Sequence, residues 1–230
     1  MHTPRKQALI IFAKRPVSGQ VKTRLIPHLT AAEAARLYEC MLRDTISRTS
    51  RLAGIDRLIF FMEEQEAAGY FHRLFPGIPL FPQQGEDLGE RMANAFRTAF
   101  DLGYREVAII GSDSPDLPLP CMESAFARLV TGEAEAVFGP SDDGGYYLVA
   151  LTKMHAELFG GIEWSRNDVL ATSLGKAAEA GIRAELLPGW YDVDRIEDLQ
   201  RLELRDRTNG APLTREFIET LGGETDKGRC

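Results

Sequence analysis

The chain is poor in cysteine. Cys40, Cys121 and Cys230 are its only three among 230 residues, and no two of them form a C-x-x-C pair. Neither a disulfide framework nor a cysteine zinc site is therefore indicated, and a reducing compartment fits this usage best. The only strongly apolar stretch near the start, residues 8–13, is far too short for a signal sequence or a membrane span. We expect a cytoplasmic protein with no membrane span.

Positive charge is also scarce. The chain carries 27 Lys and Arg against 34 Asp and Glu, a formal net charge of −7, so its surface as a whole is not built to attract nucleic acid. Hydrophobic residues make up 44% and charged residues 27%, which is ordinary globular usage. We expect one α/β domain over residues 1–207, followed by a polar C-terminal tail over 208–230 that contains one short helix near 215–221.

Apolar, β-rich runs alternate with segments of helical periodicity along the chain. The apolar runs predict strands at 8–13, 57–62, 80–81, 107–110, 136–138, 146–150 and 184–187. The periodic segments predict helices at 31–51, 63–75, 88–102, 120–130, 165–180 and 195–207. This alternation predicts a three-layer α/β/α fold with a mostly parallel, doubly wound sheet. Ligands of such sheets bind beyond the carboxyl ends of the strands.

The loop after the first predicted strand is basic in an acidic chain. It holds four cations and no acid: Lys14, Arg15, Lys22 and Arg24. Lys supplies a point charge, Arg grips phosphate oxygens bidentately, and Gly19 lets backbone N–H groups approach a ligand closely. The loop therefore indicates a phosphate site; the plain alternative is a solvated basic loop. Neither G-x-G-x-x-G nor a complete P-loop motif is present, which weighs against a dinucleotide oxidoreductase.

Three aspartates are candidate ligands for a metal ion that would also bind those phosphates. Asp113 and Asp116 follow the buried strand 107–110, and Asp194 precedes the last predicted helix. Carboxylates suit Mg²⁺ or Mn²⁺ shared with substrate phosphates, so we predict Asp113, Asp194 and Asp116 as metal ligands. The alternative roles are structural: Asp116 favours the N-terminus of the next helix, and Asp194 caps the last one.

Two adjacent acids, Asp142 and Asp143, lie in a glycine-rich turn over residues 140–146. A turn alone would explain the glycines. Acids in such a turn after a strand can also bind the hydroxyls of an acceptor or position its nucleophile. We therefore name Asp142 and Asp143, together with Lys22, as candidate catalytic residues.

Five motifs in order resemble one family. They are F-A-K-R-P-x-x-G-x-V-K-T-R-L at 12–25, G-E-D-L-G-E-R-M at 85–92, G-S-D-S-P-D-L-P at 111–118, G-P-S-D-D-G-G-Y-Y at 139–147 and Y-D-V-D at 191–194. The set resembles the transferases associated with radical-SAM/selenodomain gene neighbourhoods, in the nucleotide-diphospho-sugar transferase superfamily with its glycosyltransferase-A (GT-A) fold. The K-T-R-L and D-V-D elements are more distantly similar to phospholactate guanylyltransferase.

The resemblance implies roles for particular residues. Lys14, Lys22 and Arg24 would bind triphosphate, and Asp113 and Asp194 would bind metal. Arg91, with the segment around Gly85, would line the nucleotide pocket. The turn at 142–147 departs from the corresponding segment of the guanylyltransferase, so the resemblance does not specify the acceptor.

These features predict a metal-dependent transferase that binds a nucleoside triphosphate or a nucleotide-sugar and passes a glycosyl or nucleotidyl group to a small acceptor. Two alternatives stay open: a nucleotidyltransferase of the phospholactate guanylyltransferase type, and a non-catalytic nucleotide-binding sensor. The implied cofactor is Mg²⁺ or Mn²⁺. The implied partners are the nucleotide donor and a small-molecule acceptor, with no nucleic acid, and a homodimer is a candidate assembly.

Overall fold

The apolar runs of the sequence form the strands of one sheet. The computed structural model describes residues 6–164 and 166–224. Within these ranges the strands are β1 (Gln7–Ala13), β2 (Ile55–Phe61), β3 (Leu80–Pro82), β4 (Glu106–Ile110), β5 (Ala136–Pro140), β6 (Tyr146–Leu151) and β7 (Ala184–Leu186). Each strand predicted from the sequence is present.

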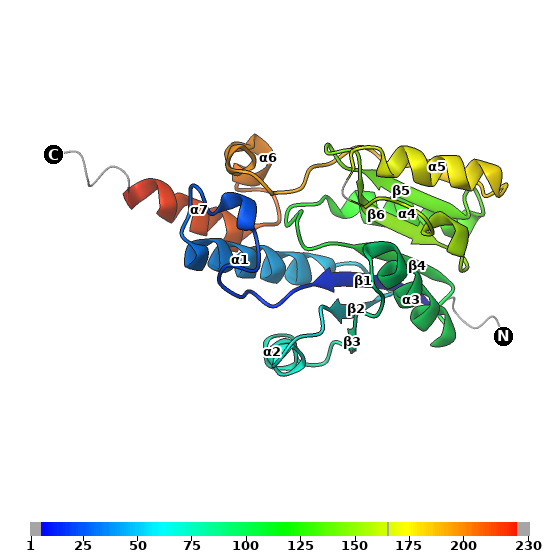
Figure 1. Ribbon diagram of the computed structural model, residues 1–230, viewed down its shortest axis with the longest axis horizontal. Coiled ribbons are helices and arrows are strands. Elements are labelled where there is room, and N and C mark those ends of the chain that lie inside the picture. Colours follow the sequence, from blue (N-terminus) through cyan, green and yellow to red (C-terminus); the bar gives the residue numbers. More distant parts are fainter. Residues whose placement is uncertain (1–5, 165, 225–230) are drawn as a thin grey trace. The chain divides into compact units, whose positions relative to one another are not determined.

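The sheet is mostly parallel and grows outward from β1 in both directions. Its order is β3-β2-β1-β4-β6-β5-β7 (Figure 1). β1 pairs in parallel with both β2 and β4, whereas β6 is antiparallel to its neighbours β4 and β5. The predicted α/β fold with a mostly parallel, doubly wound sheet is confirmed.

Helices connect most of these strands. The α-helices of the described residues are α1 (Ala31–Thr49), α2 (Ala67–Leu74), α3 (Leu88–Asp101), α4 (Leu119–Thr131), α5 (Val169–Glu179), α6 (Leu202–Arg205) and α7 (Pro212–Glu224). Short 3-10 helices are η1 (Thr23–Leu25), η2 (Ala156–Leu158) and η3 (Ile196–Gln200). None of the helices in the described part of the chain is long and apolar enough to cross a membrane.

The described chain divides into two compact units. The first contains residues 6–15, 52–111 and 119–191 except 165, and therefore the whole sheet with α2, α3, α4 and α5. The second contains residues 16–51, 112–118 and 192–224, and therefore α1, α6 and α7. The predicted boundary at residue 207 does not coincide with this division, because residues 192–224 belong to one unit. A single domain over 1–207 stays a prediction.

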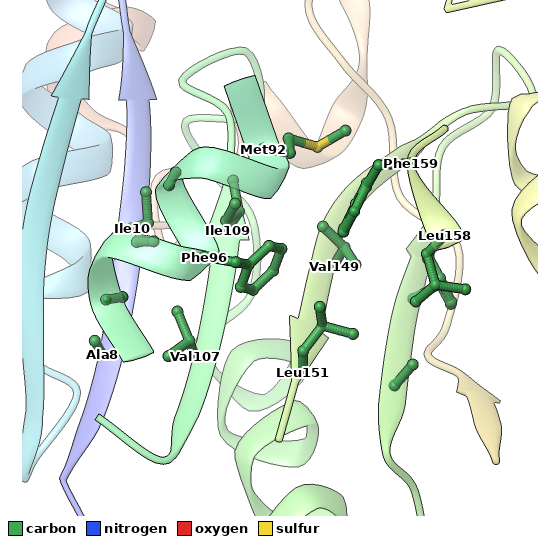
Figure 2. Close-up of a cluster of buried hydrophobic side chains, with 14 of the residues drawn as sticks. Ala8, Ile10, Met92, Phe96, Val107, Ile109, Val149, Leu151, Leu158 and Phe159 are labelled. Atoms are coloured by element: carbon green, nitrogen blue, oxygen red, sulfur yellow. The ribbon is translucent and has the colours of Figure 1, made fainter. Parts of the chain in front are cut away.

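One hydrophobic cluster of the first unit lies on one face of the sheet. Alternate strand residues, among them Ile10, Ile109 and Val149, are buried there against α3, η2 and α5 (Figure 2). Phe96 of α3 is fully buried and stacks on Phe159 with ring centroids 5.7 Å apart. Residues one step along the same strands point to the opposite face because strand side chains alternate. They are buried too, as the continuous apolar runs predict.

The second unit is organised around α1. Thr30 and Glu33 close the predicted capping box, since the Thr30 side chain accepts from the Glu33 backbone N–H and the Glu33 carboxylate accepts from the Thr30 N–H. α7 packs against α1, and Figure 1 shows the two helices side by side. The segment predicted as a polar tail thus contains a helix that is attached to α1, with Thr214 and Ile218 buried.

The single helix predicted over 195–207 is wrong. The chain forms η3 over Ile196–Gln200, adopts an extended conformation at Arg201 (ψ 134°), and then forms the short helix α6. Leu199 and Leu204 are both buried, whereas Leu202 is 83% exposed. Residues five apart lie well away from one another around a continuous α-helix, so the break at Arg201 is what allows both leucines to be buried.

The attachment of α7 gives a stability prediction. The Asp44 carboxylate of α1 is buried and accepts three hydrogen bonds: from the backbone N–H groups of Leu213 (3.2 Å) and Thr214 (2.7 Å) and from the Thr214 hydroxyl (2.8 Å). Asp44→Ala leaves these buried donors without partners, so we expect the free energy of unfolding to fall by about 2–3 kcal/mol. Urea denaturation measures this.

A matched control is Glu216→Ala, which removes an exposed carboxylate from the same helix. We expect it to change the free energy of unfolding by no more than about 0.5 kcal/mol. Equal stability of the two variants would show that the Asp44 contacts do not hold α7.

Candidate active site

The basic loop from Pro16 onward belongs to the second unit and is anchored there by apolar residues. Val21 is buried against Ala35 and Tyr38 of α1, and Leu25 is fully buried. Between them Lys22 adopts a left-handed backbone conformation (φ 48°, ψ 39°) immediately before η1. That conformation costs a non-glycine residue about 1 kcal/mol or more, so it persists only where the surroundings impose it. The two buried neighbours therefore fix the backbone from which the Lys22 side chain extends.

The segment 112–118 is held by the same helix. The Tyr38 hydroxyl and the Ser112 hydroxyl share a buried hydrogen bond of 2.7 Å. The Arg48 guanidinium donates from Nε to the Leu117 carbonyl oxygen at 2.5 Å. α1 thus positions both the basic loop and the segment that carries Asp113.

A third segment, 192–194, joins this arrangement through its backbone. The Val193 N–H donates to the Asp113 carbonyl oxygen at 2.8 Å, and the Ser114 hydroxyl donates to Asp192 Oδ1 at 2.6 Å. Val193 is fully buried. Asp192 and Asp194, on either side of it, are each half-buried. The second unit therefore brings Asp113 and Asp194 into one place.

Lys22 lies between these two carboxylates. Its Nζ is 2.5 Å from Asp113 Oδ1 and 3.0 Å from Asp194 Oδ1, and Arg24 Nη1 is 3.0 Å from Asp194 Oδ2. The Lys22 side chain is only 4% exposed, whereas those of Asp113 and Asp194 are 46% and 36% exposed. We call these four residues the Lys22 cluster.

The charges of the cluster stabilise one another. Burial by itself would lower the pKa of the Lys22 ammonium, but the carboxylates of Asp113 and Asp194 hold it above its ordinary value. Burial would raise the pKa of Asp194, but Lys22, Arg24 and Arg195 hold it below its ordinary value. Lys22 and Asp194 are therefore both charged at neutral pH.

Two further residues predicted for the site, Asp116 and Gly19, also belong to the second unit. Asp116 is buried, and its Oδ2 accepts a hydrogen bond of 3.4 Å from the Asn209 side chain. Gly19 is exposed with φ 79° in the turn closed by the Gln20 N–H and the Val17 carbonyl. Among the residues that the structure describes, no group of three or more His, Cys, Asp or Glu could hold a metal ion. Asp113 and Asp194 are the two predicted ligands that share a cation.

The remaining cations of the predicted phosphate site belong to the first unit. Lys14 is exposed directly after β1. Arg15 is paired with Glu64 at 3.3 Å and with Glu66 at 3.4 Å. These pairs explain why α2 begins at Ala67 rather than at residue 63 as predicted: the acidic residues before it pair with Arg15, and Glu66 has a positive φ of 66°.

Arg91 supports a glycine turn in the first unit. Its guanidinium donates to the Gly85 carbonyl at 3.0 Å and to the Glu86 carbonyl at 3.4 Å. Gly85 has φ 135°, and a Cβ there would lie 2.6 Å from Cβ of Glu90. Glycine is therefore required by the close approach of α3, and Arg91 fixes the backbone of the turn. A nucleotide pocket at these residues stays a prediction.

The acidic turn of the first unit presents Asp142 and Asp143 to solvent. The Asp142 N–H donates to the Trp190 carbonyl at 3.1 Å, and Asp143 Oδ1 accepts from the Gly145 N–H at 3.0 Å. Gly144 has φ 88°, and a Cβ at this position would lie 1.9 Å from the Asn167 carbonyl oxygen. The turn is thus held against the segment before α5.

The role of Asp192 was not predicted from the sequence. Its carboxylate holds the Ser114 hydroxyl and so fixes the segment that carries Asp113. The D-V-D motif contained the signal, because the alternation that exposes Asp194 also exposes Asp192. The Tyr38–Ser112 hydrogen bond gave no signal in the sequence, since 74 residues separate its partners.

Comparisons with solved structures confirm the class that the fold defines. A protein from Desulfovibrio desulfuricans G20, described as a "putative nucleotide-diphospho-sugar transferase", is 33% identical, and the match covers 94% of this chain and 98% of that one with a TM-score of 0.84. A cytidylyltransferase from Leptospira borgpetersenii is 14% identical, with 96% of each chain covered and a TM-score of 0.60, and shares the fold. The fold is that of the nucleotide-diphospho-sugar transferases, and the predicted enzyme class, a transferase, agrees with these relatives.

The chain belongs to the family described as "Uncharacterized protein conserved in bacteria (DUF2064)", whose model matches residues 45–166. Among curated proteins it is similar to phosphoenolpyruvate guanylyltransferase of Conexibacter woesei. The two are 27% identical over 222 residues, which cover 91% of this chain and 96% of that protein. The predicted superfamily is confirmed; the association with radical-SAM gene neighbourhoods stays a prediction.

The acidic turn gives the second stability prediction. Gly144→Ala combines an unfavourable positive φ with a steric overlap at Asn167, so we expect it to destabilise the protein strongly. Gly132→Ala is the matched control, since Gly132 has φ 77° and nothing within 4 Å of the added Cβ. The control should lose about 1–2 kcal/mol and Gly144→Ala at least about 1 kcal/mol more, measured by thermal or urea unfolding. Equal losses would mean that the overlap relaxes freely.

Proposed function

We propose that this chain is a metal-dependent nucleotidyltransferase that transfers a nucleotidyl group, with GTP as the first donor to test, to a small phosphorylated carboxylic acid. One observation carries the proposal: Lys22, Arg24, Asp113 and Asp194 from three separate segments meet within one unit. The relative from Conexibacter woesei, named phosphoenolpyruvate guanylyltransferase and matched over 96% of its length, supports the choice of donor and acceptor.

The two cations suit a triphosphate and a departing pyrophosphate. Arg24 is 68% exposed in its side chain and can grip phosphate oxygens bidentately while it stays near Asp194. Lys22 supplies a compact charge from a flexible stem. Positioned cations that neutralise developing negative charge are the main catalytic need of phosphoryl chemistry. Phosphate binding by Lys14 and Arg15, which belong to the first unit, stays a prediction.

The donor chemistry of the cluster fits Mg²⁺ or Mn²⁺. Asp113 and Asp194 already share one cation, the Lys22 ammonium, so the two carboxylates are close enough to hold a single cation together. Carboxylate oxygens are ligands that Mg²⁺ and Mn²⁺ prefer, and such sites use one or two carboxylates with substrate phosphates completing the coordination. When bound, the metal would supply further charge neutralisation at the phosphates. Asp116, buried beside Asn209, is more simply explained by a structural role.

The proposed reaction makes one bond and breaks one. A phosphate oxygen of the acceptor attacks the α-phosphorus of the nucleoside triphosphate. The bond from the α-phosphorus to the oxygen bridging the α- and β-phosphates breaks, and pyrophosphate leaves with that electron pair. Lys22 and Arg24 stabilise the charge on the phosphate oxygens. A phosphate acceptor is largely ionised at neutral pH, so this chemistry needs no general base.

Glycosyl transfer is the second candidate function. The relative from Desulfovibrio desulfuricans, with 33% identity, is described as a nucleotide-diphospho-sugar transferase of putative function, which favours a nucleotide-sugar donor. A hydroxyl acceptor must lose a proton, and the exposed Asp142 or Asp143 would then act as the base. The two functions therefore differ in how strongly they need the acidic turn.

An activity assay separates the candidates. The protein is incubated with Mg²⁺ and either GTP with phosphoenolpyruvate or UDP-, GDP- and ADP-sugars, and release of pyrophosphate or nucleoside diphosphate is followed. We expect pyrophosphate from GTP and phosphoenolpyruvate. Release of nucleoside diphosphate from a sugar nucleotide alone would contradict nucleotidyl transfer. Binding of nucleotide without any turnover would indicate a sensor.

A pair of variants tests the site residues in the same assay. Asp113→Asn removes a carboxylate charge from the Lys22 cluster, and we expect kcat/KM to fall about a hundredfold or more. Glu39→Gln is the matched control, because it makes the same change on α1, where Glu39 pairs with Arg43 at 2.8 Å. The control should keep near wild-type kcat/KM. Unchanged activity of Asp113→Asn would remove Asp113 from the proposed machinery.

A further inference from the structure

Lys22 has a second property that its proposed contact with phosphate does not explain. Its ammonium group contacts two carboxylates at once, at 2.5 Å from Asp113 and 3.0 Å from Asp194. The same two carboxylates are the proposed metal ligands. What we infer rests on the proposed function and concerns how the binding of metal and the binding of phosphate depend on each other.

An ammonium group and a divalent cation cannot both lie between two carboxylates. Magnesium contacts its oxygen ligands at about 2.0–2.1 Å, so an ion held by the two Oδ1 atoms that Lys22 contacts would fall in the volume that its Nζ fills. The two cations would also repel each other at that distance. One must leave before the other binds.

We propose that Lys22 is a built-in counter-ion that occupies the metal position between Asp113 and Asp194 and is displaced when the divalent metal binds. The displaced ammonium then becomes available to the phosphates of the nucleotide. The carboxylates and Lys22 thus exchange partners, with no covalent bond made or broken.

The geometry of the loop allows this exchange. Val21 and Leu25 are buried on either side and hold the backbone of Lys22 in place. The four-carbon stem of lysine can move its charge by rotation about side-chain bonds alone. Asp113 and Asp194 are exposed enough for a metal to reach them, at 46% and 36% of their side chains.

The exchange couples two ligands. A metal that arrives alone must separate Lys22 from both carboxylates and leave its ammonium without an anionic partner. A metal that arrives with a polyphosphate provides that partner. Lys22 therefore weakens the binding of metal alone, and this penalty is removed when phosphate is present, which is positive coupling between the two sites.

The affinity of the nucleotide-free protein for Mn²⁺ tests the proposal. Free Mn²⁺ is measured by electron paramagnetic resonance during titration of wild type, Lys22→Met and Arg43→Met. Lys22→Met keeps the apolar stem and removes the charge. Arg43→Met removes one positive charge from α1, where Arg43 pairs with Glu39. We expect Lys22→Met to bind Mn²⁺ at least tenfold more tightly than wild type, since an adjacent charge shifts ionic equilibria by about one to three powers of ten. Arg43→Met should bind within twofold of wild type.

An Mn²⁺ affinity of Lys22→Met equal to or weaker than that of wild type overturns the counter-ion role. If wild type nevertheless binds Mn²⁺ and loses it in Asp113→Asn, the proposed metal site stands and only the inference fails. A further titration includes GTP. If no variant binds Mn²⁺ by itself, and none binds more Mn²⁺ with GTP than GTP alone binds, the metal part of the proposed function fails as well. Lys22→Gln, with circular dichroism on the same samples, replaces Lys22→Met if the latter does not fold.

Movement of Lys22 provides a second readout in the wild-type protein. Reductive methylation followed by mass spectrometry measures how accessible the ammonium group is. We expect Lys22 to be protected without metal and to react at least fivefold faster with saturating Mn²⁺, while Lys6 serves as an internal exposed reference. Protection that does not change on Mn²⁺ binding would contradict displacement.

Discussion

The ammonium group of Lys22 connects three segments of the chain that are far apart in sequence. Without Lys22, the carboxylates of Asp113 and Asp194 would lie close together, and their like charges would repel each other. Lys22 offsets this repulsion from a side chain that is almost wholly buried, and Arg24 adds a second cation at the exposed side. Other contacts position the carboxylates that pair with Lys22 but do not neutralise them. These contacts join Tyr38 to Ser112, Arg48 to Leu117 and Val193 to Asp113. Geometry and charge thus come from different residues.

Much of the fold could be predicted from local patterns. Continuous apolar runs such as 8–11 specify buried parallel strands because both faces of such a strand are covered. The capping box at Thr30 specifies where α1 begins. The prediction failed where tertiary contacts outweigh periodicity. Leu199 and Leu204 are buried through a break at Arg201, and the acids before α2 pair with Arg15 instead of extending the helix. Neither effect is visible in a window of sequence.

The residues of the candidate site could be named from the sequence, but their mutual contacts could not. Lys22 and Arg24 were predicted to face phosphate, and Asp113 and Asp194 to face metal. In the structure these opposite charges contact each other. The reason is physical: a buried charge such as the Lys22 ammonium needs an opposite charge or hydrogen-bond partners close by. Separations of 91 and 172 residues between the partners hide this pairing from any local pattern.

The proposed function uses the same cluster in a second arrangement, in which the carboxylates hold metal and the cations hold phosphate. A crystal structure of the protein with Mn²⁺ and a non-hydrolysable GTP analogue tests this most directly, because anomalous scattering locates the manganese without assumption. The account predicts a manganese peak bonded to Asp113 and Asp194, with the Lys22 ammonium moved onto a phosphate oxygen. A bound nucleotide with Lys22 still between the two aspartates, or manganese bound away from both, would contradict it.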